Sequence, residues 1–262
     1  MKRLTRALIG MTAASLAGSL QAQEATTWDV QSDGSDRLVA SLLFDIGPGL
    51  VVQCAEGAFN FGLVNLPPAP RQTSGNRVLE TGSDLATLED SRWQTEALSS
   101  TALAFTAARR VRALRRGGVF YVRTTAAEGE PATTFALPLP TDSAGIDRVL
   151  EACGKPLVEP RDDLPEIGHL LDRTRWALRP FELYPPARAV RAGRGVTQVE
   201  VSCLIAPAGR VRDCRVESET PAGMGLGDTM LRDAGHVRLN FGDNAEAAVG
   251  GIIYMTVTSD RR

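Results

Sequence analysis

Alternating apolar and polar positions between Trp28 and Leu66 predict short β-strands. Three such strands, separated by turn residues, are Leu38 to Ile46, Leu50 to Cys54 and Ala58 to Val64. Residues 69–77 are polar and rich in turn formers, residues 77–80 form a further short strand, and residues 82–92 are expected to be an acidic loop. This pattern is typical of an antiparallel sheet.

The period changes between Ser99 and Leu114, where apolar residues recur every three or four positions and predict a helix. Three arginines, Arg109, Arg112 and Arg116, would then share its other face. Such a cluster can contact an anionic polymer or a lipid head group, but a solvated helix face is the interpretation we favour.

Two strands, 119–124 and 133–139, and a helix from Asp142 to Cys153 complete the N-terminal half. We therefore predict a mainly antiparallel β domain with two helices over residues 24–155. Its order of features resembles small periplasmic domains such as the VasI-like accessory proteins of type VI secretion. The matching residues are Trp28, Cys54, Thr134, Phe135 and Cys153. The resemblance implies a fold and no activity.

The segment from Lys155 to Pro165 holds three prolines and several charged residues, which favours a domain boundary. Apolar residues then keep helical spacing from Ile167 to Leu178, until Pro180 ends the pattern. Residues 156–183 are accordingly predicted to be a linker followed by a connector helix.

Residues 184–262 predict a small α+β domain with a three-stranded antiparallel sheet. Its expected elements are a short helix at 187–192, strands at 196–205 and 211–217, a helix capped by Asp228, and a last strand at 251–258.

The four cysteines are Cys54, Cys153, Cys203 and Cys214, an even number that favours disulfides in an exported chain. A turn centred between Ala208 and Gly209 would place Cys203 directly opposite Cys214 in a hairpin, close enough for a disulfide. Unpaired core thiols are the alternative. If the chain divides near residue 160, the natural remaining pair is Cys54 with Cys153.

Several spaced motifs after residue 180 resemble the C-terminal domain of TonB, in a branch where cysteines staple the hairpin. They are Tyr-Pro at 184, Gly-x-Gly-Val at 193, Val-x-Val at 199, Ala-Gly-Arg-Val-x-Asp-Cys-Arg-Val at 208 and Ser-Glu-Thr-Pro-Ala-Gly at 218. The resemblance covers residues 180–258. It implies a periplasmic domain that contacts outer-membrane receptors through a sheet edge, here the last strand with Ile252, Ile253, Tyr254, Met255, Thr256 and Val257.

The N-terminus shows the order of a secretory signal peptide: Lys2, Arg3 and Arg6, an apolar stretch over 7–20, then small and polar residues. We expect cleavage after Ala22, giving a soluble periplasmic protein that does not span the membrane. An uncleaved anchor would need about 20 apolar residues. TonB has such an anchor and a long Pro-rich spacer, so this chain departs from the family and energy transduction by it alone is doubtful.

Removing residues 1–22 leaves 26 Lys and Arg against 31 Asp and Glu, so the mature chain is mildly acidic and no nucleic-acid partner is expected. The two histidines, His169 and His236, lie far apart in the sequence, and no metal or cofactor motif surrounds them. Gly223, Gly225 and Gly227 lack the Lys-Ser/Thr pair of a phosphate loop. We therefore expect no enzyme, no cofactor and no metal site.

Two hypotheses of function follow. In the first, the TonB-like domain binds an extended peptide of an outer-membrane or other envelope protein, with a link to transport. In the second, the chain is a structural or secretion accessory module that acts through its N-terminal domain, with the C-terminal domain as a spacer. The identity of the partner, the physiological process and the oligomeric state are left open.

Overall fold

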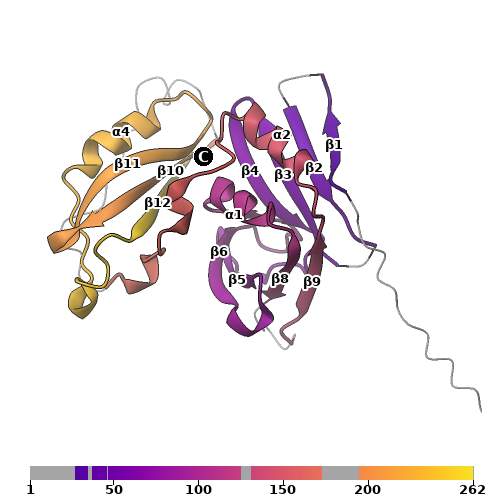
Figure 1. Ribbon diagram of the computed structural model, residues 1–262, viewed down its shortest axis with the longest axis horizontal. Helices are drawn as coiled ribbons and strands as arrows, with labels where there is room; N and C mark the ends of the chain where they lie inside the picture. The colour runs from indigo at the N-terminus through magenta and orange to yellow at the C-terminus, as the bar shows by residue number, and fades with distance from the viewer. Residues whose placement is uncertain (1–26, 35–36, 46, 125–130, 173–194, 262) are drawn as a thin grey trace, which may run out of the picture.

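The computed structural model describes residues 27–34, 37–45, 47–124, 131–172 and 195–261 (Figure 1). The predicted signal peptide, the helix at 187–192 and the Tyr-Pro motif at 184 lie outside these residues. Within them, no helix is long and apolar enough to cross a membrane.

Nine antiparallel strands form a large sheet in the order β1-β2-β3-β4-β7-β6-β5-β8-β9. They are β1 (Asp29–Ser32), β2 (Arg37–Leu42), β3 (Gly49–Ala55), β4 (Ala58–Val64), β5 (Asn76–Gly82), β6 (Glu89–Gln94), β7 (Ala102–Ala104), β8 (Gly118–Thr124) and β9 (Thr134–Leu139). The strands alternate between buried and more exposed positions, since successive side chains of a strand point to opposite faces.

Two helices, α1 (Ala107–Leu114) and α2 (Ala144–Ala152), share one apolar core with this sheet. Phe61 and Trp93 form its aromatic centre, with their rings edge to face at a centroid distance of 5.6 Å. Gly145 lets α2 approach Trp28, because a Cβ there would lie 2.4 Å from the Cβ of Trp28. The predicted disulfide between Cys54 of β3 and Cys153 at the end of α2 is confirmed.

The structure corrects two boundaries of the sequence analysis. Residues 102–104 form strand β7, so the helix predicted from Ser99 begins only at Ala107. Thr106 ends the extended segment with a left-handed backbone at φ 57°. The segment 82–92, predicted to be an acidic loop, contains most of β6. In this strand Ser91 and Trp93 are buried, and the charged Glu89, Asp90 and Arg92 are exposed.

A small sheet follows, with strands β10 (Gly195–Ala206), β11 (Arg210–Thr220) and β12 (Ile252–Arg261) in the order β11-β10-β12. Helix α4 (Leu226–Ala234) packs on one face of it over a separate apolar core. The helix begins after Gly225 and not at Asp228, the predicted cap. Both sheets are antiparallel and both carry helices, so the predicted α+β class is confirmed.

The hairpin of β10 and β11 contains the predicted disulfide between Cys203 and Cys214, but its register is less regular than expected. Near the turn, Ala206 pairs with Arg210. An unbroken register would then pair Val201 with Arg215, but Val201 pairs with Val216, one residue further along β11. The extra residue is Asp213, which adopts φ 50° next to the disulfide. A second shift leaves Glu217 as an extra residue between Val216 and Ser218. Each shift is a β-bulge.

The segment between the sheets contains two short 3₁₀ turns, η2 (Pro160–Asp163) and η3 (Gly168–Leu170). The connector helix predicted from Ile167 is therefore wrong over its described part: Leu171 is extended, and the helical pattern beyond residue 172 lies outside the described residues. The reason is that backbone groups here bond to β12 and to the loop after α4. Ile167 donates its N–H to the carbonyl of Ile252, and Asp172 donates to the carbonyl of Asn240.

Candidate functional site

The face of the small sheet opposite α4 packs against the half of the molecule that holds the large sheet (Figure 1). Along β10, Val199, Val201 and Cys203 belong to the small core, while Glu200 and Ser202, buried between them, point to the other face. Tyr254 and Thr256 of β12 also lie on that face, where they contact Arg109 and Glu200. We call this contact between the two halves, including residues 155–167, the seam.

Arginines of α1 hold the linker in the seam. The guanidinium of Arg112 donates to both carboxylate oxygens of Asp162, at 2.5 and 2.9 Å, and the Arg112 side chain is 7% exposed. Arg109 donates to the carbonyls of Asp162 and Leu164 at 3.0 and 2.9 Å. Of the three arginines expected on a solvated helix face, only Arg116 is exposed. Arg109 and Arg112 instead form internal contacts, which sequence spacing does not reveal.

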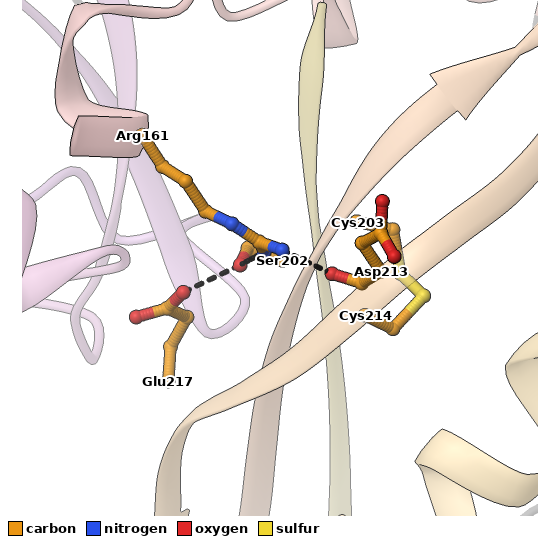
Figure 2. Close-up of a disulfide and its surroundings, with 6 residues drawn as sticks. All are labelled: Arg161, Ser202, Cys203, Asp213, Cys214 and Glu217. Carbon is orange, nitrogen blue, oxygen red and sulfur yellow. Dashed lines mark hydrogen bonds between the residues drawn. A yellow bond between two sulfur atoms is a disulfide. The ribbon is translucent and has the colours of Figure 1, made fainter. Parts of the chain in front are cut away.

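Arg161 of the linker and Lys155, directly before the linker, contact the two bulges of β11, and Figure 2 shows the contacts of Arg161. Arg161 donates to Ser202 Oγ at 3.3 Å and to the carbonyl of Asp213, and Ser202 in turn donates to Glu217 Oε1. The ammonium group of Lys155 donates a hydrogen bond to the carbonyl of Glu217. A bulge leaves its extra residue out of the strand ladder, so these two carbonyls are available to side chains. The contacts of Arg161 and Lys155 with these carbonyls therefore depend on the two bulges of the hairpin.

Glu200 is the most deeply buried acid of the seam. Its carboxylate accepts the backbone N–H of Thr106, at 2.8 and 3.0 Å to its two oxygens, and the hydroxyl of Thr256 at 3.3 Å. Burial raises the pKa of Glu200 to about 7, against the lowering effect of the Thr106 hydrogen bond. Burial also raises the pKa of Tyr254 to about 12.

The seam has little free space. A cavity of about 10 Å³ lies between Thr106, Glu200, Glu217 and Tyr254, which is room for about one water molecule. A more open hollow of about 430 Å³ lies beside Cys54 and Arg37 on the large sheet. In the described part of the chain, no group of three His, Cys, Asp or Glu residues is arranged to hold a metal ion.

The outer edge of β12 is the predicted partner-binding element. Ile252 donates its N–H to the carbonyl of Pro165 at 2.9 Å and accepts from the N–H of Ile167 at 3.0 Å, so its main-chain groups point away from β10. Because these groups alternate along a strand, those of Tyr254 and Thr256 point the same way, and those of Ile253 and Met255 point to β10. Beyond Ile252, no described residue pairs with this outer side.

The side chains of the predicted edge residues are covered on both faces of the sheet. Ile252 and Ile253 are buried, Met255 and Val257 pack in the small core, and Tyr254 and Thr256 lie in the seam. The main-chain edge is therefore the part of β12 that a partner could pair with. Sequence analysis identified this strand but missed Arg161, Glu200 and Glu217. The available signal was the presence of Leu204, Ile252 and Tyr254 on the same face of the sheet as Glu200, which indicates that this face is covered.

No protein-family model, no curated protein and no solved structure matches this chain. The observations that bear on function are therefore the geometry of the seam, the outer edge of β12 and the motifs of the sequence.

Proposed function

We propose that the chain is a periplasmic, non-enzymatic interaction protein that binds an extended segment of an outer-membrane or other envelope protein along the outer edge of β12. The observation that carries this proposal is the direction of the main-chain groups of Tyr254 and Thr256, which point away from β10 where no described residue pairs with them. The signal-like N-terminus, the two disulfides and the TonB-like motifs support an envelope location and this mode of binding.

The linker itself shows how a strand can be added at this edge. Glu166 forms a parallel bridge with Ile252, and the flanking Pro165 and Ile167 supply the two hydrogen bonds. A partner strand would continue the same pairing from Tyr254 onward. Main-chain hydrogen bonds then supply affinity, while alternate side chains select the partner sequence.

Site-specific crosslinking tests this location. A photoreactive benzoylphenylalanine at Glu166, which is exposed beside the start of the edge, should capture the partner in the native envelope. The same residue at Leu85, which is 46% exposed on the large-sheet half, should capture none. The accessory-module alternative, in which the N-terminal half makes the main contact, predicts the reverse result.

A further inference from the structure

Glu200 joins the two halves of the molecule through a single buried carboxylate. It projects from the middle strand of the small sheet and accepts the N–H of Thr106, the residue that precedes helix α1 of the other half. The N-terminus of a helix favours a negative charge, but Glu200 is only 3% exposed, and burial without a paired cation disfavours the charged form.

Charged groups reach Glu200 from every element around it. From β11, the carboxylate of Glu217 opposes its ionisation, whereas Arg110 of α1 favours it. Arg109 and Tyr254 line the same small cavity, and Lys155, directly before the linker, lies near enough to interact with Glu200. None of these cations forms a salt bridge with Glu200 among the described residues. Arg110 donates to the carbonyl of Phe105 and lies 5.3 Å from the centre of the Trp93 ring.

We propose that Glu200 is a proton-operated latch of the seam: when protonated it stays buried against α1 and keeps the two sheets docked, and when ionised it weakens that docking. The latch acts on the contact between the halves and does not depend on the identity of any partner. Tyr254 lies in the same seam, so undocking would also free its side chain.

The direction follows from linkage. The docked state raises the pKa of Glu200 from 4.5 to about 7, so it binds a proton more tightly than an undocked, solvated Glu200 would. The contribution of the proton to docking is complete below about pH 4.5 and is lost as the pH rises through 7. For these two values, docking weakens roughly 70-fold between pH 5 and pH 8.

Hydrogen exchange on the full mature chain tests the latch, with rates corrected for the intrinsic pH dependence of amide exchange. The protection of the Thr106 amide should fall roughly 70-fold from pH 5 to pH 8, while amides of Val122 in β8 and Val201 in β10 stay protected. Glu200→Gln, which keeps an oxygen acceptor but cannot ionise, should keep Thr106 protected at both pH values. Glu80→Gln is the matched control, since Glu80 pairs with Arg123 at 2.7 Å within the large sheet and should leave the wild-type response intact.

Three results would overturn the latch: equal protection of Thr106 in the wild type at pH 5 and pH 8, the same fall in Glu200→Gln, or a parallel loss of protection at Val122 and Val201. The exchange of the Thr106 amide in the wild type at the two pH values tests the latch even if Glu200→Gln does not fold.

Discussion

Replacing Cys54 and Cys153 together by alanine should lower the free energy of unfolding by about 4 to 5 kcal/mol, the larger of the two disulfide losses. The reason is loop length: this bond joins residues 99 apart, and closing a loop of that size removes about 4.7 kcal/mol of chain entropy from the unfolded state. The bond also fastens the end of α2 to β3, and Ile146, Val149 and Leu150 of α2 are fully buried in the large core. Urea denaturation of the purified protein measures the loss.

The matched control is the alanine pair at Cys203 and Cys214, which lie 11 residues apart in one hairpin. Its loop accounts for somewhat under 3 kcal/mol. A greater loss from this pair than from the long-range pair would contradict the loop-length argument.

Proline at two neighbouring positions of β12 should give opposite results. Ile253 is buried and its N–H points to β10, so Ile253→Pro should remove a ladder hydrogen bond and destabilise the small sheet by about 1 to 3 kcal/mol. Tyr254→Pro removes a donor from the outer edge and no bond of the ladder, so the fold should survive while partner binding is lost. Thermal unfolding and capture of the crosslinked partner measure the two effects.

Tyr254→Ala separates the main-chain effect from the loss of the ring. The alanine variant loses the hydrogen bond from Arg109 to the Tyr254 hydroxyl but keeps the outward N–H. It should therefore bind the partner better than Tyr254→Pro at comparable stability. Equal binding by folded Pro and Ala variants would rule out strand addition at this position.

Local patterns predicted the elements whose partners lie nearby in the sequence. Most strands of the two sheets, the hairpin turn and the Cys203–Cys214 disulfide follow from alternation, turn residues and cysteine spacing. The Cys54–Cys153 disulfide joins residues 99 apart, and it was predicted from the division of the chain into two halves with two cysteines each. The helix over 99–106 failed because Ala102 is buried as part of a strand that pairs with β4, a contact that helical spacing cannot exclude.

The individual contacts of the seam could not be predicted because they join residues far apart in the chain. Glu200 and Ser202 alternate with buried valines, which is also the pattern of a sheet with one face in water. Arg112 likewise lies on the polar side of an amphipathic helix, and only the position of Asp162, 50 residues later, makes it an internal ion pair. Periodicity identifies the polar face of an element but not what covers that face.

The most direct measurement of the central claim is amide hydrogen exchange along β12 with and without the crosslinked envelope partner, supplied as a peptide of its contacting segment. Strand addition predicts that binding slows exchange at the outward amides of Tyr254 and Thr256, while those of Ile253 and Met255, already bonded to β10, change little. Peptide binding that leaves exchange at Tyr254 and Thr256 unchanged would contradict the claim that the edge of β12 is the binding site.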